Sequence, residues 1–96
     1  MSEAAQRAAR AHAYENPRPE VQAHVPCDAR RILDLGCSSG AVGAALKARQ
    51  GAEVVGVELD EGYAADARAR LDDVLVADVE ALAADPHLPD RLGRFD

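Results

Sequence analysis

Aromatic side chains are scarce in this chain of 96 residues, which contains one Phe, two Tyr and no Trp. We therefore expect a core that is thin in large side chains. Apolar residues still make up 48% of the sequence, a share that is typical of globular rather than disordered proteins. At this length, one hydrophobic core is the expected organisation.

Cysteine is also rare, and two residues, Cys27 and Cys37, are too few for a disulfide scaffold. With no hydrophobic signal segment ahead of them, they predict a reduced, cytoplasmic protein. His24 and Cys27 have the spacing of a metal-binding pair, but no second pair matches, so we predict no metal site. Cys37 has no nearby His to activate it as a nucleophile, although its place at a helix N-terminus predicts a mildly acidic thiol.

Excess positive charge and long apolar runs are both absent. The formal net charge is -6, which disfavours nucleic acid as a partner because binding to phosphates depends on clustered Lys and Arg. No apolar run approaches the roughly 18 residues that suggest a membrane-spanning helix. We therefore expect a soluble protein with no membrane partner.

Three apolar runs, at residues 31–35, 53–59 and 74–77, alternate with segments of helical pattern. The helical segments cover residues 41–50, residues 61–71 after a capping Asp60, and a short stretch through Leu82. Apolar runs without polar alternation are typical of parallel strands covered on both faces. The sequence therefore predicts an α/β fold, a Rossmann-like three-layer parallel sheet.

The part before this pattern is helical in character. Good helix formers fill residues 2–15, and Pro19 opens a second short helix through Val25, which Pro26 closes. We therefore divide the chain into an N-terminal helical segment, residues 1–28, and a partial Rossmann-like domain, residues 29–96.

An acidic residue stands at the end of each predicted strand: Asp34, Glu58 and Asp78. A turn of small residues, Gly36–Gly40, follows the first of these and opens onto a helix. Because parallel strands share one carboxyl edge, the three acids should gather there, where like charges repel unless a ligand offsets them.

These residues resemble the first motif of the class I S-adenosylmethionine-dependent methyltransferases, an acidic residue followed by alternating glycines. The resemblance implies that the turn, through Gly36, Cys37, Ser38 and Gly40, lies against the methionine part of the cofactor. Asp34 would reach its amino-acid end. Ser38 stands where the family has its middle glycine.

The same resemblance implies that Glu58 binds the ribose hydroxyls of S-adenosylmethionine while Leu59 packs near the adenine. Asp78 would meet the adenine amino group, and the Val79 amide would meet a ring nitrogen. Since Asp60 already fills the helix cap, Glu58 looks surplus to structure. The product would be S-adenosylhomocysteine, and the methyl acceptor and catalytic residues stay unknown.

Two alternatives remain open. An NAD(P)- or FAD-binding domain would share the turn geometry, but Asp34 would oppose a pyrophosphate. A non-catalytic binding or interaction module is the other, because the family sheet has seven strands in the order 3-2-1-4-5-7-6. Here only strands 3-2-1 are present, and Arg94–Asp96 resembles the start of strand 4. We expect such a truncated sheet to self-associate or to need a C-terminal segment.

Overall fold

The structure is a computed structural model that describes residue 2 and residues 16–96. The helix predicted over residues 2–15 therefore lies outside the described residues, apart from Ser2.

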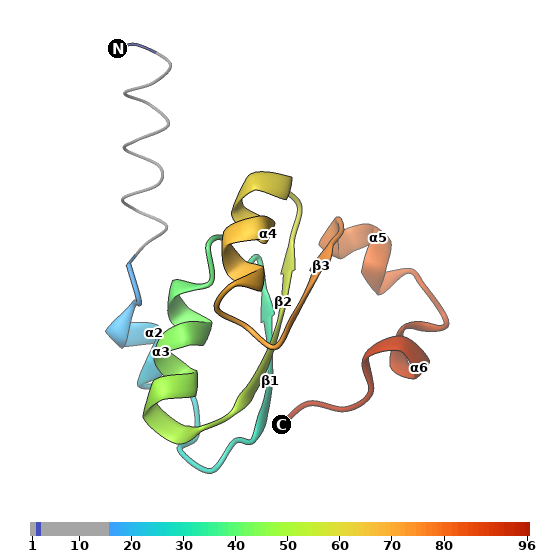
Figure 1. Cartoon of the computed structure of the whole chain (residues 1–96). Helices are drawn as coiled ribbons and strands as arrows, with labels where there is room; N and C mark the ends of the chain where they lie inside the picture. The colour runs from blue at the N-terminus through green and yellow to red at the C-terminus, as the bar shows by residue number, and fades with distance from the viewer. Residues whose placement is uncertain (1, 3–15) are drawn as a thin grey trace.

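Three parallel strands form the sheet, namely β1 (Arg31–Leu35), β2 (Glu53–Glu58) and β3 (Asp73–Val76). β2 lies in the middle, in the order β1-β2-β3, with Leu33 opposite Val55 and Val57 opposite Leu75. This arrangement, visible in Figure 1, confirms the predicted order 3-2-1 and the Rossmann-like fold.

The central strand is the most deeply buried part of the sheet. Val54, Val55 and Val57 are at most 2% exposed, because neighbouring strands cover both edges of β2 and helices cover its face. The outer strand β1 is only half-buried along most of its length and ends in an exposed Leu35.

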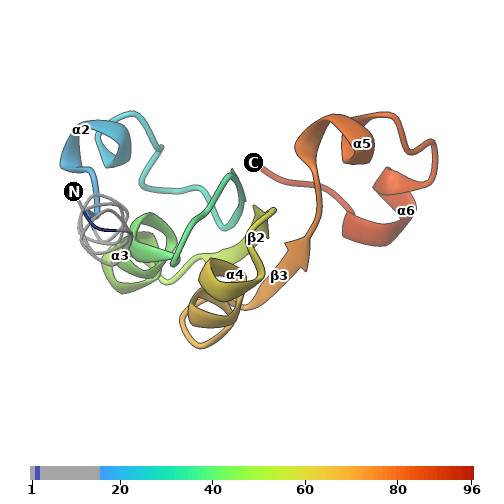
Figure 2. The same cartoon turned by 90° about the horizontal axis from the view of Figure 1, so that it is seen from above.

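Helices α3 (Ala41–Gln50) and α4 (Glu61–Arg68) pack on one face of the sheet, and α5 (Val79–Ala83) and α6 (Leu88–Leu92) lie on its other side (Figure 2). As the composition predicts, small residues dominate the contacts between the sheet and the helices α3 and α4. The core cluster consists of Cys37, Val54, Ala64, Ala67, Leu71 and Val74.

Glycine sets the spacing between α3 and the sheet. A Cβ atom added at Gly43 would lie 2.5 Å from Leu71 Cδ2 and 2.9 Å from Val54 Cγ1. The backbone of α3 can approach β2 this closely only because Gly43 has no side chain.

Helix α2 (Pro19–Gln22) is shorter than predicted, since it ends three residues before Val25. Side chains at the end of α3 hold the following loop: the Arg49 guanidinium donates to the carbonyl oxygens of Gln22 and Val25, and the Gln50 amide donates to those of Pro26 and Ala29. The Gln22 carbonyl also accepts the backbone N–H of Val25, so the chain leaves α2 through a turn. The division at residue 28 remains a prediction.

The segment Arg94–Asp96 reaches the outer edge of β1. Asp96 N donates to Arg31 O at 2.9 Å, and the Asp96 carboxylate accepts the backbone N–H groups of Arg30 and Arg31. The Arg31 guanidinium holds the segment by donating to Arg94 O and lying 4.3 Å from the centre of the Phe95 ring. The predicted start of a fourth strand is thus seen as one backbone bond to β1, without an assigned strand.

Candidate functional site

The turn between β1 and α3 folds over the carboxyl end of β2. Gly36, Ser38 and Gly40 all have positive φ angles, of 75°, 53° and 89°. The backbone N–H groups of Gly36 and Cys37 both donate to Val57 O, at 2.8 and 3.0 Å. The turn is therefore attached to the neighbouring strand by two backbone hydrogen bonds.

Gly40 is required for packing as well as for its backbone angle. A Cβ atom there would lie 3.2 Å from the Ala67 Cα atom of α4. Because the backbone of α4 cannot easily move away, the start of α3 and the middle of α4 depend on this glycine for their close contact.

Glu58 joins the end of β2 to the turn. Its Oε1 atom accepts the backbone N–H of Ser38 at 2.8 Å, and its Oε2 atom accepts the backbone N–H of Asp60 at 2.9 Å. The expectation that Glu58 is surplus to structure was therefore wrong. Asp60 does cap α4, as predicted, by accepting the N–H of Tyr63 at 3.0 Å, but Glu58 satisfies two further backbone donors.

Asp34 lies on the same face of the sheet as Glu58. It is paired with Gly56, and side chains two residues apart on a strand point to the same side. Burial raises the pKa of the Asp34 carboxyl above its ordinary value, and the nearby charge of Glu58 raises it further. Two acidic side chains, Asp34 and Glu58, therefore lie close to each other next to the turn.

Cys37 fills the space that Gly56 leaves open. A Cβ atom at Gly56 would lie 2.5 Å from Cys37 Sγ, and the Cys37 side chain is only 4% exposed. Burial, together with the charges of Asp34 and Glu58, raises the pKa of this thiol to about 12. The predicted mildly acidic thiol was wrong, because the chain turns the side chain into the core and toward two carboxylates.

Exposed apolar side chains lie along the carboxyl edge of the sheet. Among residues 16–96, four of the five exposed large hydrophobic residues lie at or just after the ends of the three strands: Leu35, Leu59, Val76 and Val79. Leu59 and Val79 were predicted site residues, whereas Leu35 and Val76, the last residues of β1 and β3, were not singled out.

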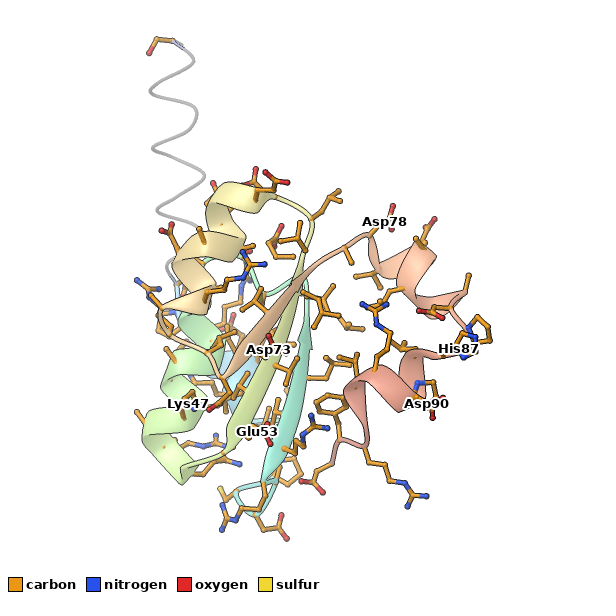
Figure 3. The ribbon with its side chains drawn as sticks, turned by 45° about the vertical axis from the view of Figure 1, so that its right-hand side comes forward. Lys47, Glu53, Asp73, Asp78, His87 and Asp90 are labelled. Atoms are coloured by element: carbon orange, nitrogen blue, oxygen red, sulfur yellow. The ribbon has the colours of Figure 1, made fainter. Side chains whose placement is uncertain are left out.

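Asp78 occupies the third strand end, where α5 begins (Figure 3). Its Oδ1 atom accepts the backbone N–H of Glu80 at 2.8 Å, so it caps the helix. The structure brings Asp34, Glu58, Cys37 and Ser38 together. Asp78 follows β3, which lies two strand spacings, about 10 Å, from β1.

A separate hollow of about 540 Å³ lies between β3 and the helices α5 and α6. Its walls contain none of the predicted site residues; they are formed by Arg68, Val74, Leu75, Val76, Ala77, Ala81, Leu82, Asp85 and Arg91. Among residues 16–96, no group of three or more His, Cys, Asp or Glu is arranged to hold a metal ion. No helix within the same range is long and apolar enough to cross a membrane.

Comparison with known proteins agrees with this geometry. The family model described as a methyltransferase domain matches residues 32–96. This chain belongs to that methyltransferase family. The class I S-adenosylmethionine-dependent family predicted from the motifs is thereby confirmed, and the matched part of this methyltransferase domain contains all of the predicted site residues.

Solved structures support the same family and fold. The TehB-like SAM-dependent methyltransferase from Corynebacterium glutamicum is similar to this chain, with 31% identity and a TM-score of 0.56. The match covers 84% of this chain and 45% of that protein, so the chain spans less than half of its relative. The bifunctional kinase-methyltransferase WbdD is 21% identical to this chain, with a TM-score of 0.53. That match covers 99% of this chain and 21% of WbdD, and it supports the fold alone. No curated protein matches.

Ser38 should make the turn of this methyltransferase domain less stable than glycine would. The left-handed conformation costs a non-glycine residue about 1–2 kcal/mol, a cost that glycine does not have. Glycine loses more conformational freedom on folding, however, and this offsets part of the gain. We expect Ser38→Gly to raise the free energy of unfolding by about 0.5–1 kcal/mol, measured by urea denaturation. The matched change Ser39→Gly, at a buried residue without positive φ, should lower it. Destabilisation by Ser38→Gly would contradict the strained turn.

Asp34 should reduce stability as the pH rises. Because its pKa is raised in the folded state, folding becomes less favourable from the ordinary carboxyl range up through that raised pKa. The stability of Asp34→Asn minus that of the wild type should therefore increase across this window and then level off. Asp72→Asn should show the opposite trend, since hydrogen bonds from Lys47 and Val54 lower the pKa of Asp72. Urea denaturation at a series of pH values measures both, and a flat Asp34 difference would refute the expectation.

Proposed function

We propose that residues 29–96 are the S-adenosylmethionine-binding part of a methyltransferase, with S-adenosylhomocysteine as the product that is released. The observation that carries this proposal is the pair of acids, Asp34 and Glu58, set against the turn, with exposed apolar side chains along the same edge of the sheet. Carboxylates that repel each other favour a ligand with positive charge. The ammonium and sulfonium groups of this cofactor supply such charge.

The turn would hold the methionine part of the cofactor. Asp34 would accept the ammonium group, while Gly36, Ser38 and Gly40 present backbone without large side chains. Cys37 could contribute only through its backbone, since its thiol lies in the core. This is a narrower role than the motif alone implies.

The remaining residues would hold the nucleoside. Glu58 would accept the vicinal ribose hydroxyls through lone pairs that the backbone bonds leave available. Leu59 and the Val79 side chain offer apolar surface for the adenine ring, and Asp78 would accept its amino group through the oxygen that does not cap α5. The Val79 amide would donate to a ring nitrogen.

The turn is less suited to a dinucleotide. A pyrophosphate binds to backbone N–H groups of a glycine-rich turn, but here the Ser38 N–H already donates to the carboxylate of Glu58. A pyrophosphate would have to displace one anion and approach another, Asp34. Both interactions favour the methyl donor over NAD(P) or FAD.

The reaction of the complete protein would be in-line transfer of the methyl group from sulfonium to a nucleophilic acceptor, driven mainly by positioning. The relative from Corynebacterium glutamicum is described as a SAM-dependent methyltransferase, and this chain covers 45% of its length. We therefore assign no catalytic base or acceptor to these residues. The free thiols of Cys27 and Cys37 support a reducing, cytoplasmic location.

The outer edge of β1 offers a place for another strand. Glu53 N donates to Arg30 O and Gly36 N to Val57 O, so the even-numbered residues of β1 face β2 and the odd-numbered ones face outward. Asp96 pairs with Arg31, which leaves the outward backbone groups of Leu33 and Leu35. We infer that a second copy of the chain, or a C-terminal segment, pairs with them.

Titration with S-adenosylhomocysteine tests the cofactor. We expect the wild type to bind it and NAD to bind far more weakly. Glu58→Ala should weaken binding by about 1.5–3 kcal/mol, the contribution of hydrogen bonds to a charged group. Glu61→Ala, which removes an exposed acid from the first turn of α4, serves as the control and should bind as the wild type does. Calorimetry measures the affinities of the wild type and of both variants. Binding of NAD to the wild type that is tighter than binding of S-adenosylhomocysteine would reverse the proposal.

Sedimentation tests the partner of β1. The 96-residue chain should form dimers or larger species at micromolar concentrations, and Leu35→Lys should weaken this association by placing a charge at the strand edge. A compact, well-folded monomer of the wild type would contradict self-association.

A further inference from the structure

The two halves of the proposed cofactor site share one side chain. Ser38 lies in the turn that would hold the methionine part, and Asp60 follows the strand end that would hold the ribose. Glu58 accepts a backbone hydrogen bond from each of them, at 2.8 and 2.9 Å. Its carboxylate therefore contacts the turn 20 residues earlier in the chain as well as the start of α4.

Three consecutive N–H groups of the turn point at the last two residues of β2. Those of Gly36 and Cys37 donate to Val57 O, and that of Ser38 donates to Glu58 Oε1. The first two bonds hold the beginning of the turn through backbone alone. The third holds its middle, at the one non-glycine residue of the turn with a positive φ, where the backbone conformation is least favourable by itself.

We propose that Glu58 is a positioning residue for the turn 36–40 as well as a ligand for the ribose, so that the methionine and ribose subsites form together. This inference rests on the proposed function. A bond from the strained residue to a carboxylate offsets the cost of its conformation, because charge-assisted hydrogen bonds are stronger than neutral ones.

The same bonds prepare Glu58 for its ligand. A carboxylate has about four lone-pair positions, and the two backbone donors use one on each oxygen. The carboxylate is thereby held in one orientation, with a remaining position on each oxygen for two neighbouring hydroxyl groups. Binding then costs little side-chain freedom, since the side chain is ordered beforehand.

A positioning role makes a prediction that ribose binding alone does not. Loss of the Glu58 carboxylate should loosen the turn even without a ligand, and should weaken ligands that lack the ribose hydroxyls. The probes are S-adenosylhomocysteine and its 2′,3′-dideoxy analogue, and the variants are Glu58→Ala, the conservative Glu58→Gln and the control Glu61→Gln.

The first measurement is amide hydrogen exchange of the unliganded protein by NMR. In Glu58→Ala, the Ser38 and Asp60 amides should exchange about tenfold faster or more, the loss expected for a hydrogen bond to a charged group. In Glu58→Gln, one of the two should lose protection, since the side-chain amide has a single acceptor oxygen. The amide of buried Leu46 should be unchanged, which separates local loosening from global unfolding.

The second measurement is affinity. For the dideoxy analogue, Glu58→Ala should reduce binding about fivefold, a smaller loss than for S-adenosylhomocysteine. Adding Ser38→Gly should recover part of it, because glycine adopts the turn conformation unaided. Glu61→Gln should change neither affinity.

The outcomes separate the two proposals. If Ser38 exchange and analogue affinity are unchanged in Glu58→Ala while S-adenosylhomocysteine binds more weakly, Glu58 binds ribose only and the positioning role is refuted. If the wild type binds neither probe but Ser38 exchange rises in the variant, the cofactor assignment fails and the link between Glu58 and the turn stands.

Discussion

The hydrogen bond from Ser38 N to Glu58 depends on the packing of two small residues, Gly56 and Cys37, beneath the turn. Gly56, in the middle of β2, has no side chain, and Cys37 occupies the space that one would fill. With Cys37 buried there, the turn descends onto the end of β2 and its N–H groups reach Val57 and Glu58. The geometry of the proposed site thus depends on a glycine two residues before the acid that it positions.

Small residues also allow close backbone contacts between the helices and the sheet. Gly40 lies against Ala67, and Gly43 lies against Leu71 and Val54, so α3 and α4 pack close to each other and to the sheet. Small residues give less apolar burial per contact, but they allow backbones to approach. This close packing fixes the start of α3, and with it the turn, relative to the central strand.

Much of this was predictable from local chemistry. The three parallel strands, the Asp60 cap and the helices α3 and α4 follow from apolar patterning and capping residues, which depend on nearby sequence, whereas the strand order was implied by the family resemblance. The backbone partners of Glu58 and the pKa of Cys37 were not predictable, because both depend on which way side chains point after the turn folds over β2. The early end of α2 at Gln22 was likewise not predicted; the Gln22 carbonyl oxygen accepts the Val25 N–H in a turn and also the Arg49 guanidinium, 27 residues away.

The two acids of the proposed site, Asp34 and Glu58, repel each other, an arrangement that does not favour folding. Asp34 is half-buried beside Glu58, and its partial burial together with the Glu58 charge raises the pKa of its carboxyl, whereas an asparagine of similar shape would lack the charge. Elsewhere in the chain, acids such as Asp72 and Asp96 accept bonds from basic side chains or backbone donors, and these bonds lower their pKa values. Asp34 has no such compensation from residues 16–96, and in the proposed function a ligand would supply the missing positive charge. A cationic amino-acid end meets that requirement at Asp34, and a pyrophosphate would add to the conflict.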